Sequence, residues 1–311
     1  MILLCGIPSE PPLRAVTEAL QQIGASYIVF NQRAFERWSI SFEVRDGGVD
    51  GELRYRARRY DLACIAAVLT RFIDDRVLPE VEGESQDSEI RCKCRSVHDA
   101  LARWIEVAPA LVINRASAMA SNSSKPYQSQ LISRHGFLIP ETLISNNPDA
   151  IRAFRRKYGR VIYKSASGVR SIVHELSDED ERRLDLVRWC PTLFQEFIGG
   201  TNIRVHIIGG KAFATAVESG ATDYRYAMSQ TGQSAKLREV ELSSDVRRKC
   251  VSLAKSLRLE FAGIDLKVTP DDQVYCFEVN PCPAFSYYEM STGQPIANAI
   301  AKHLASAGRI T

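Results

Sequence analysis

Two acids and one amide, Asp265, Glu278 and Asn280, lie in the two apolar runs of residues 263–281 of this 311-residue chain. Two apolar runs in this stretch flank a Pro-Asp-Asp turn, a pattern typical of two strands joined as a hairpin. Glu278 and Asn280 are two residues apart, so they share one face of a strand, and Asp265 lies on the partner strand. Mg²⁺ prefers such hard oxygen ligands. The spacing therefore predicts a magnesium site at Asp265, Glu278 and Asn280.

The alternative is that Asp265 and Glu278 are solvated charges on a strand. Apolar residues flank both acids. An acid inside an apolar run needs a partner that offsets its loss of hydration, which favours the metal site.

Lys164 ends a second apolar run and is followed by the small residues 165–168. A lysine at the end of a strand can meet nucleotide phosphates, and small residues let the backbone approach them. The pattern is neither a Walker motif nor a dinucleotide fingerprint. A surface turn with an exposed lysine would account for it equally well.

A third apolar run ends in Gln195-Glu196-Phe197-Ile198, directly before Gly199-Gly200. Such a linker can offer backbone N–H and C=O groups to the edge of an adenine ring, with apolar side chains as walls. The sequence therefore predicts a contact with the nucleotide base at residues 195–198.

Two arginines could meet a phosphate or a carboxylate. Arg204 and His206 alternate with apolar residues and should face the same side of a strand that turns back at Gly209-Gly210. We interpret His206 as a hydrogen-bonded histidine of the core or groove. Arg225 lies in a polar, tyrosine-flanked loop that could close over a transferring phosphate, although a solvated arginine fits as well.

Composition indicates a globular protein that carries no dedicated nucleic-acid or membrane surface. Hydrophobic residues make up 45%, charged residues 25%, and the net charge is +3. No apolar run reaches the length of a membrane helix, and the N-terminus lacks the features of a signal peptide. Cys92 and Cys94 have no nearby partners for zinc, and we expect the other scattered cysteines (Cys5, Cys64, Cys190, Cys250, Cys276) to be core residues of a reduced, cytoplasmic protein.

The elements expected along the chain begin as an α/β unit, with strands at 1–6 and 26–30 around a helix at 11–23. A hairpin at 40–56, a strand at 62–70, an exposed loop or helix start at 78–95, a helix at 98–107, a strand at 110–114 and a helix at 127–135 follow. A change of character after residue 116 predicts the end of the first domain near residue 117.

Together these segments resemble the ATP-grasp superfamily, its RimK-like branch, and within it the graspetide (microviridin-type) peptide ligases. The likeness spans roughly residues 110–311, and its segments are 122–125, 136–142, 163–164, 195–198, 202–205, 223–225, 263–281 and 292–297. In contrast to those relatives, Asn202 stands where RimK-like proteins often carry an acid, the loop after Lys164 is short, and residues 281–289 differ from the usual continuation.

The resemblance implies an ATP-grasp fold of the α/β (α+β) class. An N-terminal α/β (pre-ATP-grasp) domain at 1–117 would precede two α+β subdomains, at 118–199 and 200–311, that enclose the nucleotide. Lys125 and Lys164 would hold the phosphates of ATP, and Gln195, Glu196, Phe197 and Ile198 would hold adenine. Arg204 and Arg225 would meet the γ-phosphate or acyl phosphate, and Asp265, Glu278 and Asn280 would bind Mg²⁺.

The implied activity is an ADP-forming ligase that activates a carboxylate as an acyl phosphate and joins it to an amine or hydroxyl, with a ribosomal peptide as one candidate substrate. A small-molecule ligase for amino acids or dipeptides, and an ATP-binding module without ligase activity, are the alternatives. Neither nucleic acid nor membrane is expected as a partner. A homodimer is compatible with the sequence, which does not fix the oligomeric state.

Overall fold

The protein is described by a computed structural model that covers residues 1–165, 173–219, 232 and 235–309. The chain forms two compact units, each assembled from separate segments. Unit 1 comprises Met1–Met119, Arg258–Phe261 and Cys282–Thr311, and unit 2 comprises Ala120–Leu257 and Ala262–Pro281. The expected three-part division at residues 117 and 199 stays a prediction.

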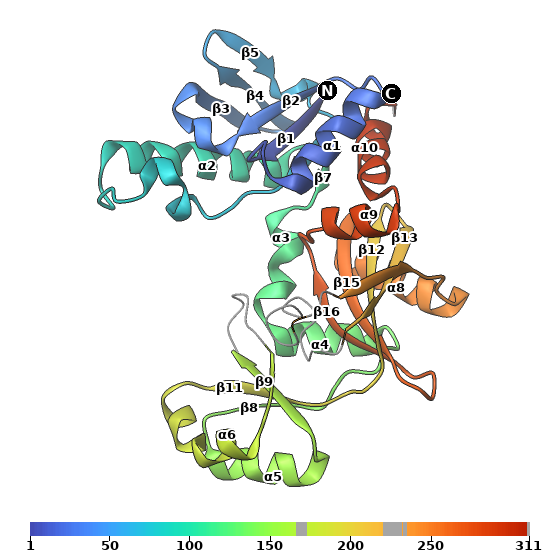
Figure 1. Ribbon diagram of the computed structural model, residues 1–311. Helices are drawn as coiled ribbons and strands as arrows, with labels where there is room; N and C mark the ends of the chain where they lie inside the picture. Colours follow the sequence, from blue (N-terminus) through green and yellow to red (C-terminus); the bar gives the residue numbers. More distant parts are fainter. Residues whose placement is uncertain (166–172, 220–231, 233–234, 310–311) are drawn as a thin grey trace. The chain divides into compact units, whose positions relative to one another are not determined.

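A four-stranded parallel sheet in the order β2-β1-β6-β7 lies at the centre of unit 1 (Figure 1). Its strands are β1 (Ile2–Gly6), β2 (Tyr27–Asn31), β6 (Ala67–Thr70) and β7 (Leu111–Ile113). Every residue of β1 is buried. Parallel strands are covered on both faces, which explains the unbroken apolar run at the start of the sequence.

The helices of unit 1 come from both ends of the chain, and α10 contacts β6 of the sheet. They are α1 (Pro11–Gln22), α2 (Glu89–Val107), α3 (Ala116–Met119), α9 (Ser286–Thr292) and α10 (Ile296–Ser306). The helix α1 packs against α10 (Figure 1). On α2, Leu101 and Trp104 share a core with Leu3 and Cys5 of β1. The predicted helix is longer than expected, because the Ser88 side chain caps it nine residues earlier than the 98–107 pattern suggests.

A three-stranded antiparallel sheet completes unit 1 and confirms the predicted hairpin. It consists of β3 (Trp38–Arg45), β4 (Gly48–Tyr55) and β5 (Arg58–Asp61). The predicted strand at 62–70 is wrong in its first half. Asp61 accepts a hydrogen bond from the N–H of Ala63 and begins a 3₁₀ turn, η2 (Leu62–Cys64), so the strand β6 begins only at Ala67. The remaining 3₁₀ turns of unit 1 are η1 (Gln32–Arg37), η3 (Asp75–Val77), η4 (Pro79–Val81) and η8 (Ala307–Arg309).

Unit 2 contains a smaller sheet with the order β10-β9-β11-β8. Its strands are β8 (Thr142–Ser145), β9 (Val161–Ser165), β10 (His174–Glu175) and β11 (Thr192–Glu196), and its helices are α5 (Pro148–Tyr158), α6 (Asp178–Arg182) and η6 (Leu184–Trp189). Ile151 of α5 packs against Val161 and Phe194 of the sheet.

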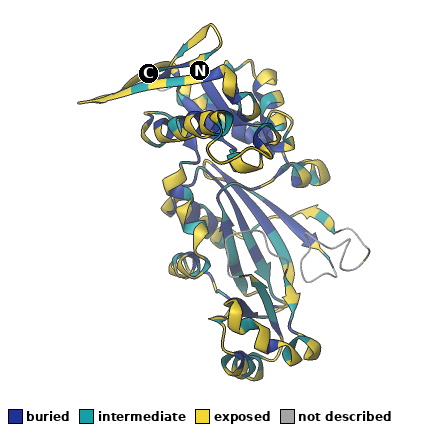
Figure 2. Cartoon of the chain, turned by 90° about the vertical axis from the view of Figure 1, so that its left-hand side faces the viewer, coloured by how far each residue is buried: buried dark blue, intermediate teal, exposed yellow. Residues whose placement is uncertain are grey.

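The larger sheet of unit 2 has five strands in the order β14-β13-β12-β15-β16. They are β12 (Thr201–Ile208), β13 (Lys211–Glu218), β14 (Lys236–Glu239), β15 (Phe261–Val268) and β16 (Val274–Asn280), accompanied by α8 (Ser244–Ser256), η5 (Ala120–Ser123) and α4 (Lys125–Arg134). Both predicted hairpins of this region are confirmed. The strands are mostly buried or intermediate, whereas the outer faces of the helices are exposed (Figure 2).

The cysteines follow the expectation only in part. Cys5, Cys250 and Cys276 are buried, as predicted for core residues. The prediction is wrong for Cys64 and Cys190, which are exposed, because each lies at the end of a 3₁₀ turn and not within a strand.

Candidate functional site

The hairpin of β15 and β16 places the two predicted metal-binding acids directly opposite each other. Asp265 pairs with Glu278 in the strand register, and Asn280 lies opposite Gly263. Residues directly opposite in an antiparallel pair project to the same face of the sheet, and so do residues two apart. Asp265, Glu278 and Asn280 therefore lie on one face, as the sequence predicted.

Each of the two carboxylates meets a basic side chain. The Nζ of Lys125 donates to Glu278, and the Nη1 of Arg204 donates to Asp265 Oδ1 at 2.6 Å. The side chains of Glu278 and Asp265 are 26% and 31% exposed. Two half-buried acids with cationic partners are not the freely solvated strand charges of the alternative interpretation.

The pKa of Glu278 is also influenced by Lys164, the lysine predicted at the end of a strand. Burial acts to raise the pKa of the Glu278 carboxyl, but the charges of three nearby cations outweigh it, so the pKa lies below its ordinary value. Those cations are Lys125, Lys164 and Arg204. Both predicted phosphate-binding lysines thus act on the same carboxylate.

The position of Lys125 is set by the way in which α4 meets β16. The side-chain amide of Gln128 donates to the carbonyl of Val279 and accepts from its N–H, both at 2.9 Å. Gln128 therefore takes the place of a neighbouring strand at this edge. Lys125 lies one helical turn earlier, on the same side of α4, and so reaches Glu278, the residue before Val279.

A cavity of about 420 Å³ joins the two lysines to the smaller sheet. Its polar lining includes Lys125, Lys164, Thr142 and Gln195. Its apolar lining consists of Ile139, Pro140, Ile144, Leu193 and Phe277, among others. Two cations together with apolar walls and a few polar groups suit a ligand that has a flat ring and an anionic tail.

The linker residues 196–198 do not belong to the described lining of this cavity, in contrast to Gln195. The Glu196 carboxylate accepts a hydrogen bond from the N–H of Glu141 at 2.9 Å, which ties the start of the linker to the residue before β8. The Phe197 ring lies under the guanidinium of Arg160, 3.7 Å from its centroid. The carbonyl of Ile198 accepts from Lys267 Nζ at 3.0 Å.

Lys267 is a residue of this region that sequence reasoning missed. It lies two residues after Asp265 on the same strand, and its Nζ is 5.6 Å from the ring centroids of both Phe197 and Phe277. Burial lowers the pKa of its amine. A lysine inside an apolar strand, in phase with an acid, was the signal that could have revealed it.

Close packing at the linker depends on Gly200. Its φ is +137°, and a Cβ at this position would overlap the carbonyl oxygen of Val268 on β15. Only glycine fits both conditions. The linker can therefore lie directly against the strand that carries Asp265.

The predicted metal ligands fit Mg²⁺ by donor type. Two carboxylates and one amide offer hard oxygen atoms, and none of the three is a thiol or imidazole. Among the described residues, no cluster of three or more His, Cys, Asp or Glu side chains is placed to hold a metal. A site here would thus depend on Asn280, on water and on the ligand's own phosphates.

The other predicted residues are placed as follows. His206 is fully buried on β12, in agreement with its interpretation as a core histidine. Arg225 lies outside the described residues. Gln128 and Thr142 were not predicted as site residues, because their roles depend on contacts between distant segments.

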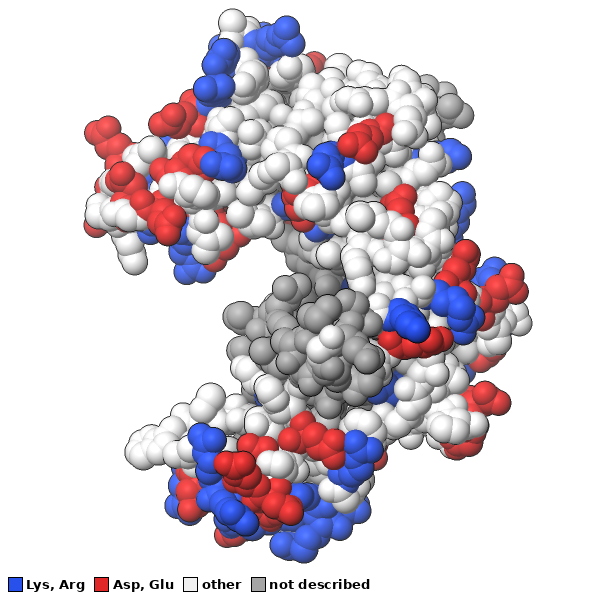
Figure 3. Space-filling view, viewed as in Figure 1, with Lys and Arg blue, Asp and Glu red and all other residues white. Residues whose placement is uncertain are grey.

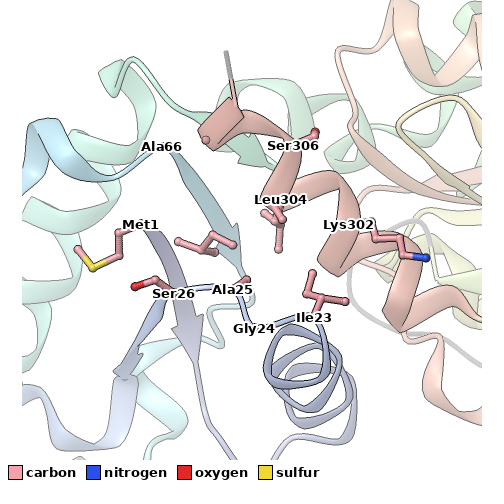
Figure 4. Close-up of a pocket in the computed structure, with 12 residues that line it drawn as sticks. Met1, Ile23, Gly24, Ala25, Ser26, Ala66, Lys302, Leu304 and Ser306 are labelled. Carbon is pink, nitrogen blue, oxygen red and sulfur yellow. The ribbon is translucent and has the colours of Figure 1, made fainter. Parts of the chain in front are cut away.

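A second cavity, of about 620 Å³, lies in unit 1 between β1, the end of α1 and α10 (Figure 4). Its lining is dominated by small and apolar residues such as Ile23, Ala25, Ala66 and Leu304. It contains no carboxylate, and Lys302 is its one charged side chain among the described lining residues. It therefore lacks the groups that phosphoryl transfer requires.

Comparison with known proteins identifies the class to which this site belongs. Residues 122–304 match the RimK-like ATP-grasp domain. The match covers more than half of the chain, so the chain belongs to the RimK-like ATP-grasp family. The predicted ATP-grasp fold is confirmed, and the protein is an ATP-grasp ligase that uses ATP.

Sequence relatives carry the name probable alpha-L-glutamate ligase. The protein from Psychromonas ingrahamii is 30% identical over 215 residues, which are 66% of this chain and 70% of that protein. The one from Marinomonas sp. is 28% identical over 216 residues, again 66% of this chain and 70% of the relative.

Solved structures of peptide ligases match the chain over nearly its whole length. The macrocyclase MdnC from Microcystis aeruginosa, bound with precursor peptide MdnA, has a TM-score of 0.82 at 22% identity and covers 98% of this chain and 100% of its own, a likeness of fold. The ATP-grasp ligase PsnB, complexed with minimal precursor, Mg and ADP, has a TM-score of 0.79 at 25% identity and covers 99% of this chain and 97% of its own.

No described helix is long and apolar enough to span a membrane.

Proposed function

We propose that this ligase modifies a peptide, joining a side-chain carboxylate to an amine or hydroxyl of the same substrate with ATP and Mg²⁺. The observation that carries the proposal is the extent of the likeness to PsnB, which includes the N-terminal α/β unit and covers 99% of this chain. The relatives named as glutamate ligases align with only 66% of it.

Within the site, we assign the phosphates of ATP to Lys125 and Lys164, which line one cavity. The linker 195–198 is assigned to the adenine ring. Asp265, Glu278 and Asn280 are assigned to Mg²⁺, which when bound would neutralise phosphate charge. Arg204 and Arg225 are assigned to the γ-phosphate or the acyl phosphate.

A carboxylate is a poor electrophile until it is phosphorylated, and the resulting acyl phosphate has a good leaving group. Phosphoryl transfer spreads negative charge over several oxygens, so catalysis depends on positioned cations. Lys125, Lys164 and Arg204 supply three such charges around Glu278. An amine or hydroxyl then attacks the acyl carbon and releases phosphate.

The second candidate is a ligase for free amino acids or dipeptides, favoured by the names of the sequence relatives. The experiment that separates the two is ADP release measured together with mass spectrometry of the acceptor. Peptides with acidic, lysine and threonine side chains form one panel, and free amino acids form the other. A peptide that loses the mass of one water for each ADP supports the proposal, and ADP release with amino acids alone favours the alternative.

A further inference from the structure

We propose that Thr142 makes the base site selective for adenine nucleotides by fixing the orientation of the Gln195 side-chain amide. This inference rests on the proposed nucleotide site. Gln195 is the group that would touch the base, and Thr142 is a positioning residue that acts through it. Both line the cavity that also contains Lys125 and Lys164.

Thr142 and Gln195 lie directly opposite each other where β8 pairs with β11. Gln195 Nε2 donates to Thr142 Oγ1 at 2.9 Å, and the Thr142 hydroxyl donates to the carbonyl of Pro140, also at 2.9 Å. A hydroxyl has one proton, and here it is given to Pro140. Only a lone pair remains for Gln195, so the amide must present its NH₂ group to Thr142.

The consequence is that the Gln195 carbonyl oxygen, Oε1, is turned away from Thr142. Gln195 is 5% exposed, and Oε1 has no hydrogen-bond partner in the described part of the chain. A buried acceptor without a partner costs free energy, which a ligand that supplies a donor would recover.

The residues that line the cavity indicate which ligand group would donate to Gln195 Oε1. Ile144, Leu193 and Phe277 suit a flat aromatic ring, and the two lysines suit an anionic tail. Adenine carries an exocyclic amino group that donates hydrogen bonds. A 6-oxopurine such as hypoxanthine or guanine carries a carbonyl in that place, which would bring two acceptors together. Two acceptors that face each other lower the affinity for the wrong ligand. This discrimination is stronger than the discrimination that one missing methylene group provides.

The test uses ADP and inosine diphosphate, which differ at this position of the ring, and measures the binding of each by calorimetry with Mg²⁺ present. Thr142→Val keeps the shape of the side chain but removes the hydroxyl, so the amide is free to turn. We expect its preference for ADP over inosine diphosphate to fall by roughly tenfold, the effect of one hydrogen bond to a buried group. Thr142→Ser keeps the hydroxyl and should retain the preference of the wild type.

If Thr142 had a merely structural role, its substitution would weaken the binding of both nucleotides alike. The ratio of the two affinities would then be unchanged. A wild-type ratio in a folded Thr142→Val protein would therefore overturn the inference, and so would a wild-type protein that binds both nucleotides equally. Binding of neither nucleotide by the wild type would overturn the proposed nucleotide site as well.

A double-mutant cycle gives an independent check. Gln195→Leu removes the acceptor itself and should lower the preference for ADP over inosine diphosphate, as Thr142→Val does. Because Thr142 acts through Gln195, the double variant should show no further change. Additive effects of the two substitutions would contradict the coupling.

Discussion

Lys125 on α4 forms an ion pair with Glu278 on β16, and the helix is held in that position by the two hydrogen bonds between Gln128 and the backbone of Val279. The pair joins a lysine assigned to phosphate with an acid assigned to the metal. In such a pair, each charge offsets the loss of hydration that the other charge suffers in a half-buried environment.

Removal of Lys125 tests this relationship. Lys125→Met should lower the rate of ADP formation by about 100-fold or more, the usual effect of removing one charge-stabilising group. The reason is that the phosphates lose a cation and Glu278 loses its partner. Lys255→Met, on the exposed side of α8, is the matched control and should keep wild-type activity. Equal rates in the two variants would contradict the assignment.

The strand residues are tested by Glu278→Ala and Lys164→Ala. We expect each to abolish ATP turnover while circular dichroism shows an intact fold, because both residues face the same cluster of charges and not the hydrophobic core. Full activity in both variants would show that the site has been assigned to the wrong residues.

The packing of the linker is tested at Gly199 and Gly200, the two residues that follow it. Gly200→Ala introduces a Cβ against the carbonyl of Val268 at a φ of +137° and should destabilise the protein by about 2 kcal/mol or more. The measurement is the free energy of unfolding in denaturant. Gly199→Ala is the control, since a Cβ there meets only the edge of the Phe197 ring, at 3.9 Å. Equal stability of the two variants would mean that the linker does not pack as described.

The pH dependence of stability is tested at Glu175, which is bonded to Arg160 at 2.7 and 2.8 Å. This contact holds the pKa of the Glu175 carboxyl below its ordinary value. The folded state therefore binds the proton less readily than the unfolded chain. The stabilisation is complete above the ordinary pKa of a glutamate and is lost as the pH falls through the lowered value.

Glu175→Gln should accordingly be less stable than the wild type near neutral pH, by about 0.2–1 kcal/mol for an exposed pair. The difference in melting temperature should shrink on acidification. Glu179→Gln, at an exposed position of α6, is the control for the substitution itself. A difference for Glu175→Gln that grows towards low pH would have the wrong sign.

The sequence predicts those parts of the site that depend on local pattern. Strand alternation places Glu278 and Asn280 on one face, and the turn at 270–272 brings Asp265 opposite Glu278. The glycine pair at 209–210 likewise predicts the hairpin of β12 and β13. These features follow from the chain's period of two and from turn chemistry, which a single sequence displays.

Contacts between distant segments could not be predicted in the same way. Lys125 and Glu278 are 153 residues apart, and their meeting depends on how Gln128 docks α4 on the sheet edge. The bond between Thr142 and Gln195 depends on the register of β8 with β11. Pattern alone does not fix either arrangement, because tertiary packing selects it.

Charged side chains of both signs occur together on one face of the protein (Figure 3). On the face shown in Figure 3, basic and acidic side chains are interspersed. The net charge of the chain is only +3. A nucleic-acid partner would favour a continuous basic surface.

The central claim is tested most directly by following ADP and peptide mass in one reaction that contains the wild-type protein, ATP, Mg²⁺ and a peptide with acidic, lysine and threonine side chains. The account predicts that each ADP formed is matched by the loss of one water from the peptide, and that both signals disappear when Mg²⁺ is chelated. ADP formation that persists without Mg²⁺, or that leaves every peptide of the panel unmodified, would contradict it.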